Sequence, residues 1–100
     1  MATNSRLSPY GITDDLIRAE LYREIRKGAP GWTEYTINPD EALFPELVSQ
    51  RAYGIDQLKW VVLIASGVDN MRDRLPVGTT IKLPPIVWVR QRIKYYSERV

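Results

Sequence analysis

The segment Asp56–Gly67, DQLKWVVLIASG, constrains the fold more than any other part of this chain. Placed on a helix, its apolar residues divide into two stripes on roughly opposite sides. A helix that is apolar around most of its circumference must be covered on more than one face. Because a chain of 100 residues has few elements to supply that cover, the sequence predicts that a neighbouring subunit completes it. The first stripe is Leu58, Val61, Val62 and Ala65, and the second, which we expect to contact the partner, is Trp60, Leu63 and Ile64.

Composition and charge restrict the class of protein. The chain is 44% hydrophobic and 26% charged, which is ordinary for one small globular domain. With 14 basic and 12 acidic residues its net charge is +2, too balanced for a dedicated polyanion binder. It contains no cysteine and no histidine, which excludes disulfides, thiolate zinc sites and histidine-dependent catalysis. We therefore expect a protein that is not an enzyme and holds no metal or cofactor.

The sequence contains no signal for insertion into a membrane. No apolar run approaches the roughly 20 residues that cross a bilayer. The N-terminal residues, MATNSRLSPYG, lack the apolar stretch of a secretory signal. We therefore expect a protein that is made in the cytoplasm and has no membrane partner.

Breaks in the hydrophobic pattern divide the chain into short elements. Residues 1–11 predict an irregular arm. A helix start is then indicated by Thr13, Asp14 and Asp15, and a helix end is indicated by Gly28. The same run also alternates as a strand would, so helix and strand both stay open for residues 16–27. The other expected elements are a strand over 32–37, a helix over 45–53 that begins at Pro45, a helix over 56–67 capped by Asp56, a strand over 79–83 and a helix from Pro85 to the end of the chain.

The C-terminal segment 85–100 fits a helix with two distinct stripes. One stripe is an apolar seam with steps of three and four residues. The neighbouring stripe combines Trp, Tyr and Arg, the residue types that dominate protein–protein interfaces. The seam is Ile86, Val89, Ile93, Tyr96 and Val100; the neighbouring stripe is Trp88, Arg92, Tyr95 and Arg99, of which we expect the first three to contact a partner.

The order strand, helix, helix, strand over residues 32–84 has recognisable landmarks. They are YTI, ELVSQRAYG, LKWVVLIASGVDN and LPVGTTIKLP. These landmarks resemble the LysM-like proteins of contractile phage tails, namely the baseplate wedge family and the small tail protein X family. Members of those families carry a "YG…WWV…AN" helix pair and a "LPxGTxIxLP" closing strand. The resemblance covers about half of the chain and is most specific at Leu75–Pro84, whereas Lys59-Trp60 and Ala65-Ser66 depart from the pattern.

The resemblance implies a fold and a role. The fold would be α+β with a LysM-like βααβ core at residues 32–84, in which two helices pack on a two-stranded antiparallel sheet. Residues 1–31 would be an N-terminal arm and extension, and residues 85–100 a C-terminal helical extension. The role would be that of a virion structural protein, assembled in the host cytoplasm, that joins tube, sheath, wedge or hub proteins of the tail and baseplate. Several copies would form a symmetric ring.

Glycan binding is the main alternative, because ordinary LysM domains bind N-acetylglucosamine polymers such as peptidoglycan. The corresponding loops here are residues 38–44 and 68–74. The simpler interpretation, which we prefer, is that Phe44 anchors the core and residues 69–70 form a turn. The residues that would contact sugar in the glycan interpretation are Phe44, Met71, Asp69 and Asn70.

Nucleic-acid binding and catalysis receive less support. The helix over 56–67 offers only Lys59 as a basic residue and is otherwise too apolar for a hydrated DNA groove. A glycosidase requires two carboxylates at a suitable separation, and Asp40, Glu41 and Glu46 are the candidates. We expect these three acids instead to charge and cap a helix start.

Overall fold

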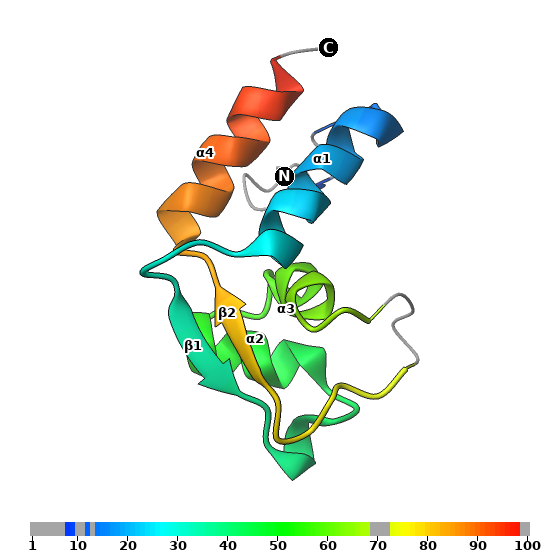
Figure 1. Ribbon diagram of the computed structural model, residues 1–100, viewed down its shortest axis with the longest axis vertical. Helices are drawn as coiled ribbons and strands as arrows, with labels where there is room; N and C mark the ends of the chain where they lie inside the picture. The colour runs from blue at the N-terminus through cyan, green and yellow to red at the C-terminus, as the bar shows by residue number, and fades with distance from the viewer. Residues whose placement is uncertain (1–7, 10–11, 13, 69–72, 99–100) are drawn as a thin grey trace.

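A two-stranded antiparallel sheet and four α-helices make up the part of the chain that the structure describes (Figure 1). The structure is a computed structural model that describes residues 8–9, 12, 14–68 and 73–98. The predicted α+β class is confirmed. The elements are α1 (Asp15–Lys27), β1 (Thr33–Thr36), the 3-10 helix η2 (Pro39–Glu41), α2 (Pro45–Tyr53), α3 (Lys59–Ala65), β2 (Thr80–Leu83) and α4 (Ile86–Ser97).

The sheet pairs the two predicted strands across the two helices that separate them in sequence. Thr33 lies opposite Leu83, and Thr36 lies opposite Thr80. The hydroxyl oxygens of Thr36 and Thr80 are 2.8 Å apart. The order strand, helix, helix, strand predicted for residues 32–84 is therefore observed, and α2 packs on α3 while α3 packs on β2.

Residues 15–27 form a helix, which settles the choice that the sequence leaves open. The Asp14 carboxylate caps the helix, because its Oδ1 accepts hydrogen bonds from Leu16 N at 2.8 Å and Ile17 N at 3.3 Å. Gly28 ends it with a φ of 71°, a left-handed conformation that favours glycine. Thr13, the first residue of the predicted start, lies outside the described residues.

Helix α3 begins later than predicted, and its predicted cap is wrong. Asp56 does not cap the helix; its carbonyl instead accepts from Lys59 N at 3.4 Å in a turn that precedes α3. Leu58 occupies the N-cap position without a side-chain hydrogen bond. The buried Ser49 hydroxyl organises the connection, because it donates to Ile55 O at 2.5 Å and accepts from Leu58 N at 3.3 Å. The start of α3 is therefore positioned by Ser49 of α2, a tertiary contact, and not by the local cap Asp56 that the sequence suggests.

Helices α2 and α4 follow their predictions closely. Pro45 is the first residue of α2, and Gly54, with a φ of 80°, follows its last residue. Helix α4 begins after Pro85 and buries Val89, Ile93 and Tyr96 of the predicted seam. Val100, the last residue of that seam, lies outside the described residues.

The hydrophobic core is centred on α3. Four of the seven residues of α3, from Val61 to Ile64, are buried. Figure 1 shows α3 between α2 on one side and α1 on the other, and α1 in turn packs against α4. Ile12, which lies just before α1, is completely buried, a contribution that we do not predict from the sequence. The core therefore takes residues from all three predicted parts of the chain, including Ile12, Leu21, Ile25, Val48, Leu58, Leu83, Val89 and Ile93.

This arrangement predicts that α1 is essential to stability. Leu21 is completely buried, so Leu21→Ala should lower the free energy of unfolding by about 2–5 kcal/mol. The matched control is Leu16→Ala on the same helix, which should have little effect because Leu16 is 81% exposed. Urea denaturation of both variants measures the difference. Equal effects of the two substitutions would show that α1 is not part of the core.

Candidate interaction surface

The predicted second stripe of α3 is covered by the chain itself. Leu63 and Ile64 are only 9% and 8% exposed, because α1 lies across this side of α3. Trp60 is half-buried, and the centroid of its ring lies 6.2 Å from that of Tyr22 on α1. The prediction that a neighbouring subunit must cover Leu63 and Ile64 is therefore wrong, whereas a partner contact of Trp60 remains a prediction. The sequence does not predict that α1 covers this stripe, because residues 16–27 fit a strand as well as a helix.

The predicted contact residues of α4 lie together beside the seam that packs on α1. Trp88 and Arg92 are half-buried, and Tyr95 is 47% exposed. The Trp32 ring lies 4.8 Å from the Trp88 ring in an edge-to-face arrangement, which joins the start of β1 to α4. We call Trp32, Trp88, Arg92 and Tyr95 the aromatic–arginine surface. Trp32 was not predicted to belong to it, since no sequence pattern connects residues so far apart.

Arg92 fixes this surface to α1. Its Nε and Nη2 donate to Glu24 Oε1 at 3.1 and 3.0 Å, and Nη2 also reaches Glu24 Oε2 at 3.1 Å. The Tyr96 hydroxyl donates to Glu24 Oε1 at 2.6 Å. The guanidinium carbon lies 4.5 Å from the centroid of the Tyr95 ring and 4.8 Å from that of Tyr96. Arg92 therefore positions the neighbouring aromatic rings as well as contributing its own exposed area.

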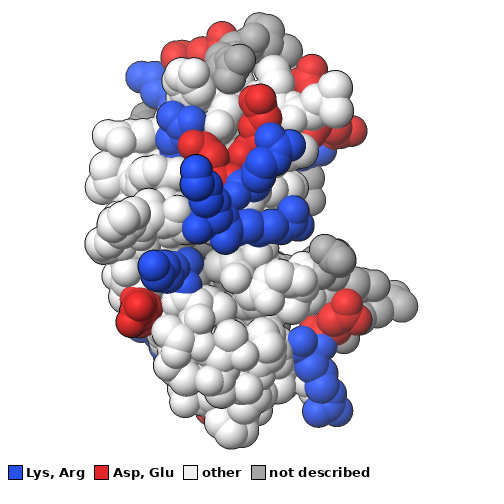
Figure 2. All heavy atoms as spheres, viewed as in Figure 1, with Lys and Arg blue, Asp and Glu red and all other residues white. Residues whose placement is uncertain are grey.

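The contacts with Glu24 shift the pKa values of Arg92 and Tyr96. Burial alone would lower the pKa of Arg92, but the hydrogen bonds with Tyr96 and Glu24 outweigh burial and raise it. Burial and the hydrogen bond to Glu24 raise the pKa of Tyr96. Figure 2 shows that charged side chains of both signs gather over α1 and α4, while much of the surface over the sheet and α2 is uncharged.

A second group of exposed apolar residues lies at the other end of the molecule. Leu43, Phe44 and Val77 are each about half exposed, with Phe44 at 52%. Backbone hydrogen bonds hold their two loops side by side, from Leu75 N to Ala42 O and from Gly78 N to Ile37 O, both at 2.8 Å. We call Leu43, Phe44 and Val77 the apolar end. The prediction that Phe44 anchors the core is wrong, because it lies at the surface. A shallow hollow beside it is lined by Phe44, Glu46, Leu47, Gln50 and Asp56.

Of the loops assigned to glycan binding, the structure describes only part. Residues 38–44, 68 and 73–74 are described, whereas Asp69, Asn70 and Met71 lie outside the described residues. The Leu75–Ala42 hydrogen bond brings the first loop next to the end of the second. Phe44 is therefore the candidate sugar contact for which the structure gives a position.

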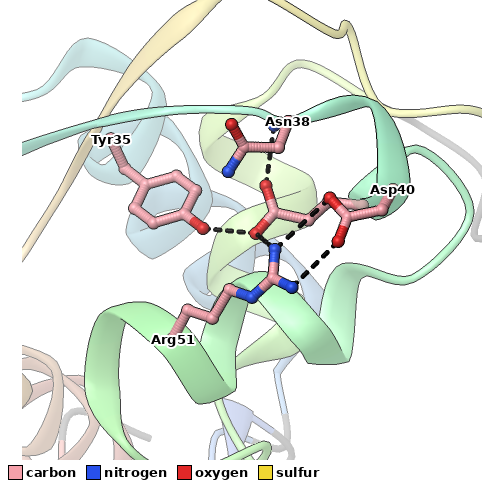
Figure 3. A network of polar contacts seen from close by, with 5 residues as sticks. Tyr35, Asn38, Asp40 and Arg51 are labelled. Carbon is pink, nitrogen blue, oxygen red and sulfur yellow. Dashed lines mark hydrogen bonds and ion pairs between the residues drawn. The ribbon is translucent and has the colours of Figure 1, made fainter.

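Two of the three candidate catalytic carboxylates, Glu41 and Asp40, belong to one structural network (Figure 3). Glu41 is completely buried and accepts hydrogen bonds from Tyr35 OH, from Asn38 N at 2.7 Å and from Arg51 Nη1 at 2.8 Å. Arg51 Nη2 also donates to Asp40 Oδ2 at 2.9 Å. The Asn38 contact caps η2, an element that we do not predict; of the three acids expected at the start of the helix over 45–53, Glu46 lies in the first turn of α2. The network as a whole ties β1 and η2 to α2, a role that the sequence does not reveal.

The pKa shifts in this network favour charged carboxylates. The hydrogen bond from Arg51 is the main cause that lowers the pKa of Asp40. Burial on its own would raise the pKa of Glu41, but the hydrogen bonds from Tyr35, Asn38 and Arg51 outweigh burial and lower it. A general acid needs a raised pKa, so Glu41 and Asp40 are not suited to that task. Among the described residues, no cluster of three or more acidic side chains could hold a metal ion.

Comparisons with known proteins give no assignment. No protein-family model, no curated protein and no solved structure matches this chain. The LysM-like identity of the βααβ segment therefore remains a prediction. None of the described helices has the length and apolar content needed to cross a bilayer.

The lowered pKa of Glu41 leads us to expect that the stability of the protein depends on pH. Its pKa in the folded state lies below the ordinary value of 4.5, so the network stabilises the protein above that value. The stabilisation is lost as the pH falls through the folded-state pKa. Glu41→Gln should lower the free energy of unfolding at neutral pH by about 1–3 kcal/mol and flatten its decline in acid. Urea denaturation between neutral and strongly acidic pH measures both effects.

The control for this experiment is Glu46→Gln. Glu46 lies in the first turn of α2 and forms no ion pair with a described residue, so its substitution should leave stability at neutral pH almost unchanged. A Glu41→Gln variant as stable as this control would contradict the role assigned to the buried carboxylate.

Proposed function

We propose that this protein is a non-enzymatic assembly component that joins other proteins through its aromatic–arginine surface. The observation that carries the proposal is the position of Tyr95 and Trp88, which reach solvent while the Arg92–Glu24 ion pair and Trp32 hold them in place. Aromatic and arginine side chains supply most of the energy at protein interfaces. Because these side chains are ordered in advance, a partner loses less entropy on binding them.

The apolar end extends this proposal to a second partner. Leu43, Phe44 and Val77 belong to loops remote from α4, at the opposite end of the molecule in Figure 1. An assembly protein with contact surfaces at both ends bridges two neighbours. Such a bridge suits the role implied by the resemblance, a component of the tail or baseplate of a contractile phage or a related injection device. In a symmetric ring, individually weak contacts are multiplied.

Glycan binding is a second candidate, favoured by one observation. The exposed Phe44 ring lies beside the polar side chains of Gln50 and Asp56 in the hollow of α2. An apolar face with a few polar groups is the general composition of a small-ligand site. The hollow is shallow, however, and Phe44 is the one aromatic residue among those that line it, whereas the aromatic–arginine surface combines three aromatic side chains with an arginine, so protein binding is the better supported function.

The proposal is tested by binding to the products of neighbouring reading frames. Trp88→Ala and Tyr95→Ala should each weaken capture of an adjacent tail or baseplate protein about tenfold or more. Val87→Ala is the matched control, because Val87 is exposed on another side of the same helix. Circular dichroism checks that each variant is folded, and surface plasmon resonance measures affinity.

Two outcomes would contradict the proposal. Equal affinities for the wild type, Trp88→Ala and Tyr95→Ala would exclude the aromatic–arginine surface as the binding site. Retention on purified peptidoglycan that is lost in Phe44→Ala, without any binding to adjacent proteins, would favour glycan recognition instead.

A further inference from the structure

The outer edge of β1 is open. Strand β2 lies on one side of β1, and Figure 1 shows no described element along the other side. Strand β2 is better covered, because α3 packs against it. An open edge presents unpaired N–H and C=O groups that can pair with another strand.

The hydrogen-bond pattern identifies the unpaired groups. Ile37 N donates to Thr79 O at 3.1 Å, so residues 37 and 79 form a pair joined by one ladder hydrogen bond, while Thr79 N donates instead to Pro76 O at 3.1 Å. Such pairs alternate along an antiparallel ladder, so Tyr35 pairs in this way with Ile81. Glu34 and Thr36 therefore direct their backbone N–H and C=O groups away from β2. Both residues are exposed.

Neighbouring residues limit the open edge to these two. The N–H of Trp32 donates to Ala29 O at 3.3 Å, and the N–H of Asn38 donates to Glu41 Oε1 at 2.7 Å. The carbonyl of Asn38 accepts from Glu41 N at 3.0 Å. A strand that adds to this edge therefore finds free donors at Glu34 and Thr36 alone.

We propose that β1 pairs with β1 of a second copy of this chain across a two-fold axis, which joins the two sheets into one antiparallel sheet of four strands. In the proposed register, Glu34 of each copy lies opposite Thr36 of the other, and the two Tyr35 residues face each other at the axis. Both cross-copy pairs are hydrogen-bonded pairs, so the backbone N–H and C=O groups of Glu34 and Thr36 in both copies are satisfied. Shifting the register by two residues leaves some of these groups unpaired.

Charge supports the same register. Glu34 lies beside Lys82 within its own sheet and would meet an uncharged threonine across the axis. A register that placed Glu34 opposite its own copy would bring two carboxylates together, which is unfavourable. The paired edge is self-complementary, as a two-fold symmetric contact requires. This contact goes beyond the proposed function, since it uses β1 and not the exposed residues of α4.

The first test is sedimentation equilibrium of the full chain up to millimolar concentration, because so short a contact gives a weak dimer. The average mass should rise from 11.6 kDa toward twice that value. Thr36→Pro removes the N–H that the second copy needs and should keep the protein monomeric. Thr36→Ala is the matched control: it loses the same hydroxyl but keeps the N–H, and it should associate like the wild type.

A second test measures the register and does not depend on the proline variant. The chain has no cysteine, so single cysteines report on this contact alone. An equimolar mixture of Glu34→Cys and Thr36→Cys should form interchain disulfides under mild oxidation several times faster than either variant alone, because residues 34 and 36 are opposed only between copies.

These experiments separate the possible outcomes. A constant monomeric mass, or cross-linking that is the same in the mixture and in the separate variants, would overturn the proposal. A dimer that Thr36→Pro does not disrupt would place the contact elsewhere and would also overturn it. Neither result bears on the capture of adjacent proteins by Trp88 and Tyr95.

Discussion

The burial of α3 is the constraint on which the rest of the structure depends. This helix has only seven residues and includes the apolar run from Val61 to Ile64, all of which is buried. A helix so short gains little from its own hydrogen bonds, so tertiary packing must stabilise it. Helices α1 and α2 and strand β2 supply that packing from different sides. The chain therefore covers by itself a helix that its sequence would assign to the interface with another subunit.

Two ion pairs with tyrosine partners hold the covering elements in position. Glu24 and Arg92 join α1 to α4 with the help of Tyr96, and Glu41 and Arg51 join η2 to α2 with the help of Tyr35. Both carboxylates accept several hydrogen bonds; for the buried Glu41 these offset the cost of removing its charge from water, whereas the Glu24 side chain remains 38% exposed. Each ion pair also lies close to a candidate contact surface, the aromatic–arginine surface in one case and the loop that carries the apolar end in the other. The same interactions thus stabilise the fold and order the exposed residues.

The sequence predicted the elements whose signals are local. Pro45, Gly54, Gly28 and Pro85 mark helix ends in both the sequence and the structure. Helix α1 was ambiguous because the spacing of its apolar residues fits a strand as well as a helix, and this ambiguity led directly to the wrong interface at Leu63 and Ile64. Asp56 is a residue type that often caps helices, but the start of α3 is instead positioned by Ser49 on α2, whose hydroxyl accepts a hydrogen bond from Leu58 N.

The candidate sites were predictable only where one helix carries them. Trp88, Arg92 and Tyr95 share a helical stripe, so their proximity follows from their spacing. Trp32 joins them through a contact between elements far apart in sequence. The exposure of Phe44 and the burial of Glu41 likewise depend on which elements pack over them, and residue type gave the opposite expectation in both cases.

The most direct test of this account is native-state hydrogen exchange on the dilute protein, which compares the amides of α1 with those of α3. If α1 is the cover of α3, the amides of Leu21 and Ile25 and those of Leu63 and Ile64 should exchange with the same free energy, that of global unfolding. Amides of α1 that exchange much faster than those of α3 would show that α1 detaches while the core persists, and would contradict the account.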